Sequence, residues 1–448
     1  MKLYNTQSRQ VKEIDLSNDQ ISMYCCGPTV YRDAHVGNLR TFLLSDLIAR
    51  VIKINGSTVK LIQNITDVGH MSEDFVNDDK MLAQAKLEKI DPFEIARKYE
   101  QRFHTDLMAL NIQPAAAYPR ASESIEMMLT LIGKLVDAGF AYVGSDSSVY
   151  FSAEEFATYG AISGNKLESL KPGHKHDTTE DSAKRFHADW ALWKAAGDRT
   201  QMVWDSPWGK GFPGWHIECS AMSLDLLDGH IDIHVGGIDL RFPHHENERA
   251  QSNALIDYEA VDLWVHGEHL LFEGKKMSKS SGNVVLLSDV IARGFDPLSI
   301  RLCFLENKYR SQMDLTWNSI EAAHETLKRW RSKMAQWGVG DSLAVDAEIE
   351  LAVNSDLDTS RAVLRLREIE KSDLDNKAAI FRYADQVLGL DLGRPVEKRV
   401  LTTQMQALLE ARALARVEKR WADSDQLRVE LEFLGLEIQD TPQGQSWS

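Results

Sequence analysis

The stretch ISMYCCGPTVYRDAHVGNLRTFLLSDLIARVI, residues 21–52, decides the fold class of this chain. Residues 21–26 are apolar enough for a buried strand, which Gly27 and Pro28 stop. Residues 39–52 then carry apolar side chains at helical spacing. A strand, a glycine-containing turn and a helix together present backbone N–H groups and a positive dipole end to phosphate. The stretch therefore predicts a phosphate-binding α/β domain.

Strand-like segments continue on both sides of a long interruption. Residues 58–62 are typical of the next strand, and strand-like sequence returns at residues 231–235 and 263–265. A region inserted between two halves of one domain explains this order. We therefore expect a Rossmann-type domain with a parallel sheet and a connective insertion.

Beyond residue 315 the sequence changes to helical periodicity. Trp317, Trp330 and Trp337 share one apolar face with aliphatic residues, which predicts core packing rather than a platform for stacked bases. A linker-like segment with Gly393 and Pro395 then leads to a small C-terminal module. The predicted domains are the two-part Rossmann-type domain, the connective insertion, a helical bundle and the C-terminal module: residues 1–113 with 209–314, 114–208, 315–389 and 390–448.

Composition and charge exclude some functions and leave others open. The chain has 448 residues, four cysteines and a formal net charge of −16. It has no apolar run of membrane-spanning length and no signal-peptide core, so we expect a cytoplasmic protein without a membrane partner. Four cysteines in a chain of this length indicate thiols or metal ligands, not a disulfide framework. Net charge alone argues against nucleic acid, but a basic stripe can be local.

Four potential metal ligands are scattered along the chain. His244 and Glu248 are four residues apart, which puts both side chains on one face of a helix. Cys219 and a cysteine at the end of the first strand add two thiolates, and all four groups are zinc ligands. Adjacent strand residues point to opposite faces, so either Cys25 or Cys26 would reach the metal, and the residues alone do not choose. Buried thiols and a core histidine are the commoner alternative.

A second phosphate-handling signature, Lys276–Met277–Ser278–Lys279–Ser280, lies far from the first, His35–Val36–Gly37–Asn38. Together, in this order, they resemble the two ATP-binding signatures of class I aminoacyl-tRNA synthetases. Residues 214–223 and 236–248 resemble the corresponding segments of cysteinyl-tRNA synthetases almost residue for residue. The resemblance covers nearly the whole chain.

The resemblance implies an ATP site. His35, Lys276 and Lys279 would hold the triphosphate and stabilise charge on the leaving pyrophosphate. Asn38 stands where many class I enzymes have a histidine; its amide still donates a hydrogen bond, whereas a cationic role for it is excluded. Asp239 would bind a ribose hydroxyl. The implied ATP-binding residues are Gly37, Gly236, Gly237, Asp239, Lys276 and Lys279, with Mg²⁺ accompanying the ATP.

The resemblance also selects Cys26 over Cys25 and implies one Zn²⁺ per chain. The implied ligands are Cys26, Cys219, His244 and Glu248. Zinc would bind the substrate thiolate and so distinguish cysteine from serine. Thr66 and Trp215 match positions that line the amino-acid pocket. The implied reaction is activation of L-cysteine with ATP to cysteinyl-adenylate, followed by transfer of cysteine to the 3′-terminal ribose of tRNA-Cys. The sequence does not determine the oligomeric state, for which we expect a monomer.

The C-terminal module carries Arg412, Arg416 and Arg420 at four-residue spacing, which predicts a basic stripe on one helix face. A solvated helix face is the alternative. The module also resembles the anticodon-binding end of cysteinyl-tRNA synthetases, which implies contact with unpaired bases of the tRNA. The implied anticodon residues are Arg416, Trp421, Asp425 and Asp440.

Two other functions compete with this interpretation. One is an ATP-dependent ligase that joins cysteine to an amino-sugar inositol; it resembles this family but has no need of an anticodon module. The other is an inactive, zinc-containing binding paralogue, against which the intact His35, Lys276 and Lys279 argue.

Overall fold

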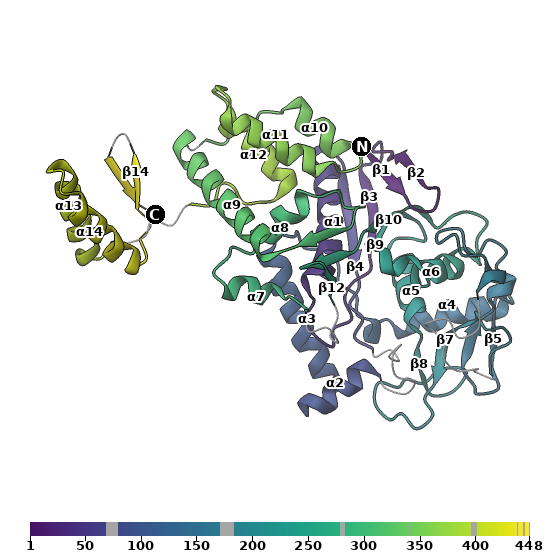
Figure 1. Cartoon of the computed structure of the whole chain (residues 1–448). Helices are drawn as coiled ribbons and strands as arrows, with labels where there is room; N and C mark the ends of the chain where they lie inside the picture. The colour runs from purple at the N-terminus through teal and green to yellow at the C-terminus, as the bar shows by residue number, and fades with distance from the viewer. Residues whose placement is uncertain are drawn as a thin grey trace. The chain divides into compact units, whose positions relative to one another are not determined.

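The computed structural model describes residues 1–68, 79–170, 183–277, 283–338, 340–395, 401–436, 438–441 and 444–447. The chain forms two compact units, Met1–Gly393 and Arg394–Ser448. Figure 1 shows the sheet of the larger unit between an insertion and a helical region. Among the described residues, no helix combines the length and the apolar character needed to cross a bilayer.

A four-stranded parallel sheet, in the order β10-β9-β3-β4, forms the centre of the larger unit. The strands are β3 (Gln20–Cys25), β4 (Thr58–Gln63), β9 (Ile231–Gly237) and β10 (Val261–Gly267). The predicted α/β fold with a parallel sheet is confirmed. Helix α1 (Val36–Ile54) follows β3 and begins three residues earlier than expected, because His35 caps it.

The sheet is joined to an insertion that has its own antiparallel sheet, in the order β5-β6-β7-β8. Its four strands and helix α4 enclose a second apolar core, which includes the fully buried Trp193 and Phe151. Helix α5 leads from the insertion back to strand β9 of the central sheet, and α6 connects β9 to β10. The bounds are α2 (Lys80–Glu88), α3 (Pro92–Ala109), α4 (Ile125–Asp137), β5 (Ala141–Val143), β6 (Val149–Phe151), β7 (Trp190–Ala195), β8 (Gly211–Pro213), α5 (Trp215–Leu226) and α6 (His244–Asn253).

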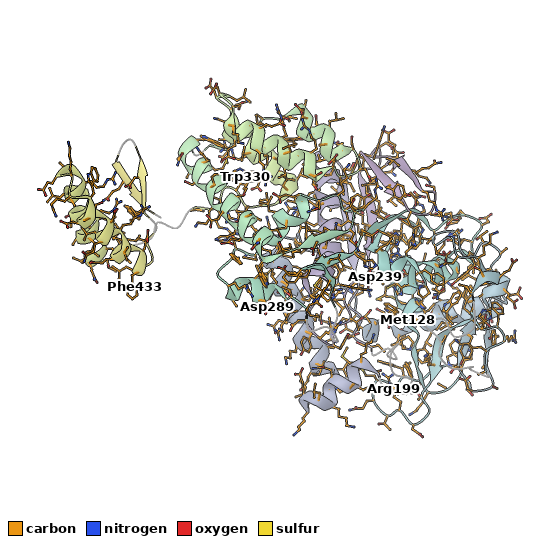
Figure 2. The ribbon with its side chains drawn as sticks, in the orientation of Figure 1. Met128, Arg199, Asp239, Asp289, Trp330 and Phe433 are labelled. Carbon is orange, nitrogen blue, oxygen red and sulfur yellow. The ribbon has the colours of Figure 1, made fainter. Side chains whose placement is uncertain are left out.

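The rest of the larger unit is mainly helical, as predicted. Trp330 is fully buried, and Trp317 and Trp337 pack against the same core, so the prediction of core packing for these tryptophans is confirmed. Figure 2 shows Trp330 among the helices of this region. The bounds are β1 (Lys2–Asn5), β2 (Gln10–Glu13), β11 (Leu270–Phe272), β12 (Lys275–Lys276), α7 (Leu287–Ala292), α8 (Leu298–Leu305), β13 (Met313–Leu315), α9 (Trp317–Trp337), α10 (Ala347–Asn354), α11 (Thr359–Lys371) and α12 (Lys377–Leu388).

A buried arginine joins the helical region to the α/β layer. Arg301 on α8 is completely buried, and its Nη2 donates to Oδ2 of Asp46 on α1 at 2.6 Å. Its other nitrogens donate to the carbonyl oxygens of Leu388 and Leu110, at the ends of α12 and α3. Arg50 donates to the same carboxylate oxygen of Asp46 at 2.8 Å. Four helices therefore meet at one charged network in the core.

Asp106 on α3 makes the stability of the larger unit depend on pH. Burial raises the pKa of Asp106 to about 6; the Asp33 charge adds to the rise and Arg102 opposes it. The native state therefore holds this proton more tightly than the unfolded chain, and stability is lost as the pH rises from about 4 through about 6.

We expect Asp106→Asn to raise the free energy of unfolding at pH 7 by about 1 kcal/mol, after discounting for its partial exposure. The gain should be smaller near pH 4, where the native carboxyl is protonated and the unfolded one is about half protonated. Urea unfolding at the two pH values measures this difference. If the gain in the free energy of unfolding were no larger at pH 7 than at pH 4, the raised pKa of Asp106 would be contradicted.

The smaller unit pairs two helices with a hairpin: α13 (Thr403–Val417), α14 (Trp421–Phe433), β14 (Ile438–Thr441) and β15 (Gly444–Trp447). The predicted basic stripe is wrong for Arg412, whose side chain is only 1% exposed. Its guanidinium donates to Asp440 and Gln445 of the hairpin. Arg412 therefore holds the helix against the hairpin instead of facing solvent.

Candidate active site and metal centre

The candidate active site lies where the order of the parallel sheet reverses. β3 pairs with β4 on one side and with β9 on the other, and open α/β sheets bind ligands beyond the carboxyl ends at such a switch point. Cys26 follows β3 and Gly237 ends β9. Both line a cavity of about 240 Å³, together with Asn38, Trp215 and Asp239. Figure 2 shows Asp239 in the middle of the larger unit.

The first signature forms the cap of α1. The His35 Nδ1 accepts a hydrogen bond from the Asn38 backbone N–H, and the Asn38 Oδ1 accepts one from the His35 N–H, both at 3.2 Å. Burial and, next, the nearby Arg32 charge lower the pKa of His35. With Nδ1 occupied as an acceptor, the neutral ring keeps its Nε2–H as a donor. His35 therefore offers a phosphate a neutral hydrogen bond at the positive end of a helix.

The second signature lies only partly within the described residues. Lys276 is exposed on β12, which pairs with β11, and it is not among the described residues that line the cavity. Lys279 lies outside the described residues, so its role in ATP binding stays a prediction. The first signature nonetheless lies beside the segment that follows the second, because the Val36 N–H donates to the carbonyl of Val285, five residues beyond that signature, at 3.0 Å. Gly37 also lies against the Met277 side chain of the second signature.

The last two residues of β9 have to be glycines. A Cβ on Gly236 would lie 2.3 Å from Cε1 of His245, and one on Gly237 would lie 2.3 Å from Oδ1 of Asp239. Any side chain here would therefore displace one of these two groups. The pair lets the backbone pass close to Asp239, which faces the cavity.

Four buried donor groups converge beside this cavity. Ligand atoms of Cys26, Cys219, His244 and Glu248 all lie within 4.8 Å of one another. The Cys26 Sγ is 3.8 Å from the Cys219 Sγ and 3.5 Å from Oε1 of Glu248. Helix α6 begins at His244, so His244 and Glu248 lie one turn apart, with Nε2 and Oε1 separated by 3.0 Å. The structure thus brings all four predicted ligands together.

The chemistry of this cluster fits a divalent metal. Burial raises the pKa values of Glu248 and Cys26, so a bound cation would stabilise the charged forms of both groups. Oε2 of Glu248 has no hydrogen-bond partner among the described residues. A thiolate, imidazole and carboxylate set is the donor set of zinc sites. Cys25 is not among these donors, because its sulfur accepts from Gln63 at 3.7 Å instead of facing the cluster.

The structure adds histidines that the sequence did not predict. His234 and His245 form a second four-donor group with Cys26 and Glu248. The His245 Nδ1 lies 2.8 Å from Nε2 of His266, and burial lowers the pKa values of all three histidines. His234 lies inside strand β9, and a buried polar residue in an apolar strand is the one signal that would have singled it out.

The predicted amino-acid pocket residues flank the cluster. The Trp215 ring lies 4.3 Å from the His244 ring, and Trp215 shares the cavity with Cys26. Thr66 Oγ1 donates to the buried Glu218 carboxylate at 3.1 Å, and burial raises the pKa of Glu218. Thr66 is therefore held by a carboxylate that sequence reasoning missed, and it is not among the described residues that line the cavity.

Three of the four predicted anticodon residues cluster on the smaller unit. The Arg416 Nη1 lies 2.9 Å from Oδ2 of Asp440, and its Cζ lies 5.9 Å from the centre of the Trp421 ring. The Trp421 side chain is 56% exposed. Asp425 is exposed one turn further along α14. The cluster presents an aromatic face next to an ion pair.

The fold defines the class of protein. Residues 12–325 match a family model described as the tRNA synthetases class I (C) catalytic domain. The fold is similar to that of a methionyl-tRNA synthetase from Mycobacterium tuberculosis in complex with methionyl-adenylate, with a TM-score of 0.54 at 15% identity. That likeness covers 83% of this chain and 90% of the other. The larger unit therefore has the class I aminoacyl-tRNA synthetase fold.

Full-length relatives narrow the class to one family. Residues 399–447 match the model of the cysteinyl-tRNA ligase anticodon binding domain. A cysteine–tRNA ligase of Chlamydia caviae is 39% identical over 99% of this chain and 96% of its own length. One from Thermus thermophilus is 38% identical over 95% and 94%, respectively. The chain belongs to the cysteine–tRNA ligase family of class I aminoacyl-tRNA synthetases.

Proposed function

We propose that this enzyme activates L-cysteine with ATP and then transfers cysteine to the 3′-terminal ribose of tRNA-Cys. One observation carries the proposal: Cys26 from the four-donor cluster and Asp239 from the nucleotide turn line the same cavity. Cysteine held at one end and ATP at the other would place the attacking carboxylate next to the α-phosphate. The bond from that phosphate to pyrophosphate then breaks, and cysteinyl-adenylate forms.

Different residues around the cavity would bind different parts of ATP. Asp239 would accept a hydrogen bond from a ribose hydroxyl. His35 and Asn38 would donate neutral hydrogen bonds to the phosphates, while Lys276 and Lys279 would supply positive charge opposite them. Because burial lowers the pKa of His35, we assign the cationic role to the lysines. Mg²⁺ would accompany ATP and neutralise part of the phosphate charge.

The four-donor cluster would hold one Zn²⁺ through Cys26, Cys219, His244 and Glu248. Zinc there would supply a soft Lewis acid that prefers the sulfur of cysteine to the oxygen of serine. Trp215, packed against His244 and facing the cavity, would shape the wall beside the substrate side chain. Thr66, held by Glu218, would position the amino-acid end of the site.

The smaller unit would bind the anticodon of tRNA-Cys. Trp421 offers an exposed ring for an unpaired base, and Arg416 and Asp440 offer a donor and an acceptor beside it. We propose that Asp425 belongs to the same surface, and that the enzyme acts as a monomer. The ligase that joins cysteine to an amino-sugar inositol is not favoured, because it has no need of an anticodon domain.

We expect Trp421→Ala to lower kcat/KM for tRNA-Cys by roughly tenfold to a hundredfold, because stacking contributes about 1–3 kcal/mol per base. Cysteine-dependent ATP–pyrophosphate exchange should not change, since that step needs no tRNA. Phe433→Ala is the matched control, because Phe433 is a more exposed aromatic residue of the same helix. An equal loss with both variants would refute a specific role for Trp421.

Charging of a tRNA-Cys transcript with labelled cysteine tests the proposed function. Serine and a chelator-treated sample run alongside. Cysteine-specific charging that is lost on chelation and restored by Zn²⁺ is the expected result. Cysteine-dependent exchange without charging of the tRNA would overturn the assignment of the acceptor.

A further inference from the structure

One arginine on the wall of the active-site cavity has no role in the chemistry described above. Arg32 lies on the loop between β3 and α1, three residues before His35, and it lines the cavity of about 240 Å³. The exposed Lys276 is not among the described residues that line this cavity. Arg32 therefore places a positive charge at the site where the triphosphate of ATP is proposed to bind.

The loop holds Arg32 between two anchored residues. On one side, Val30 is buried, and its N–H donates to the carbonyl of Thr66 at 3.1 Å. On the other side, Asp33 pairs with Arg102 of α3 at 2.7 Å. Contacts on both sides thus fix the backbone from which the Arg32 side chain extends, so a ligand need not order this part of the loop.

The hydrogen-bonding capacity of Arg32 is not used within the described part of the chain. No carboxylate there forms an ion pair with Arg32, and no acceptor there takes a hydrogen bond from it. Its guanidinium Cζ instead lies 5.0 Å from the centre of the Tyr31 ring, which also lines the cavity. A ring contact on the face of a guanidinium uses none of the N–H donors in its plane. These donors are therefore available to an anionic ligand.

The acidic residues of the same cavity do not cancel this charge. Asp33 is neutralised by its ion pair with α3, and Asp239 is the proposed acceptor for a ribose hydroxyl. The charge of Arg32 reaches the neighbouring His35, because it adds to the effect of burial in lowering the pKa of His35. The positive charge therefore lies at the N-terminus of α1, where the helix dipole also favours an anion.

We propose that Arg32 binds a phosphate of ATP beside His35 and supplies the positive charge that Asn38 lacks. The inference rests on the proposed function, in which ATP is the anionic substrate of this cavity. Arginine matches the oxygens of a phosphate through paired N–H donors, whereas the amide of Asn38 carries no charge. As the cysteine carboxylate bonds to the α-phosphorus and the bond to pyrophosphate breaks, negative charge moves onto the pyrophosphate. Arg32 stabilises that charge from the side of α1.

Cysteine-dependent ATP–pyrophosphate exchange by the full-length enzyme tests this role. We expect Arg32→Met to lower kcat/KM for ATP by roughly tenfold to a hundredfold, because it removes charged hydrogen bonds to phosphate. The KM for cysteine should stay within about twofold, since the four-donor cluster is unchanged. Arg32→Lys should recover part of the loss, because it keeps the charge but not the paired donors. Inhibition of exchange by adenosine, which has no phosphate, should not change in either variant.

Two further variants serve as comparisons. Arg185→Met is the matched control, because Arg185 also stacks on a tyrosine ring, Tyr142 of the insertion, at 4.0 Å, and it is not among the described residues that line the cavity. Its exchange activity should equal that of the wild type. Lys80→Met removes a cation from the opposite part of the chain that lines the cavity, the start of α2. A larger loss with Lys80→Met than with Arg32→Met would overturn the assignment to Arg32.

An unchanged kcat/KM for ATP in Arg32→Met, or an equal rise in the KM for cysteine, would contradict the proposal. Arg32→Gln carries the test if Arg32→Met does not fold. Calorimetric titration with Mg²⁺–ATP separates this inference from the proposed function. If the wild type binds ATP but shows no cysteine-dependent exchange, the proposed function fails. In that case a weaker affinity of Arg32→Met for ATP still supports the phosphate contact, and an equal affinity overturns it.

Discussion

Cys219→Ser is expected to lower the rate of cysteine-dependent ATP–pyrophosphate exchange by about a thousandfold or more. The sulfur of Cys219 lies 3.8 Å from that of Cys26 in a site where every donor is buried. Serine is nearly isosteric, but its hydroxyl is a harder and far less acidic ligand than a thiol. Loss of the metal removes several kcal/mol of interaction with the substrate, and about 4 kcal/mol corresponds to a thousandfold. ATP binding should persist, because Asp239 and His35 are untouched.

The chain supplies two matched controls for this variant. Cys25→Ser changes the neighbouring thiol, which contacts Gln63 instead of the cluster. Cys303→Ser changes a buried thiol that donates to the carbonyl of Ser319. Both variants should retain exchange activity and one metal ion per chain. Metal content is measured by atomic absorption. ATP–pyrophosphate exchange is measured while the concentrations of cysteine and of ATP are varied. Full activity and metal content in Cys219→Ser would exclude this residue as a ligand.

Arg301→Met is expected to destabilise the larger unit by about 3–5 kcal/mol, the usual effect of breaking a buried ion pair. The change leaves Arg50 as the remaining cation beside Asp46 and removes donors from the carbonyl oxygens of Leu388 and Leu110. Because these partners lie on three different helices, α1, α12 and α3, no local rearrangement replaces the lost bonds.

Urea unfolding, monitored by tryptophan fluorescence, measures this loss of stability. Arg361→Met is the control, because Arg361 pairs with Glu348 on the surface and such pairs contribute about 1 kcal/mol or less. The urea concentration at the midpoint of unfolding should fall clearly for Arg301→Met and hardly change for Arg361→Met. Similar midpoints for both variants would mean that the buried network adds no stability beyond its packing.

Local sequence patterns predicted the first strand, turn and helix of the α/β domain correctly. The strand over residues 21–26, the glycine turn and the following helix appear in the structure, because each depends on near neighbours in sequence. The error at the start of α1 has a local cause as well. His35 and Asn38 close the cap through side-chain hydrogen bonds, which are not visible in apolar periodicity.

The site was predictable to the extent that residue chemistry and short spacings determine it. His244 and Glu248 follow from helical spacing, and the glycine turn holds Asp239 at the cavity. His234 and Glu218 were missed, because their burial depends on pairings between distant parts of the chain. Arg412 was misassigned for the same reason, since its partner Asp440 comes from a hairpin 28 residues later.

The order of strands in the central sheet has a consequence for synthesis of the protein on the ribosome. β3 is complete at Cys25, but one of its two neighbours, β9, begins only at Ile231. At about 5–20 residues per second, roughly 10–40 s separate the emergence of the two strands. During that time β3 has a parallel edge open to other chains, and Cys26 lacks its later partners. Helix α1, which follows β3 at once, is the element available to shield the nascent sheet.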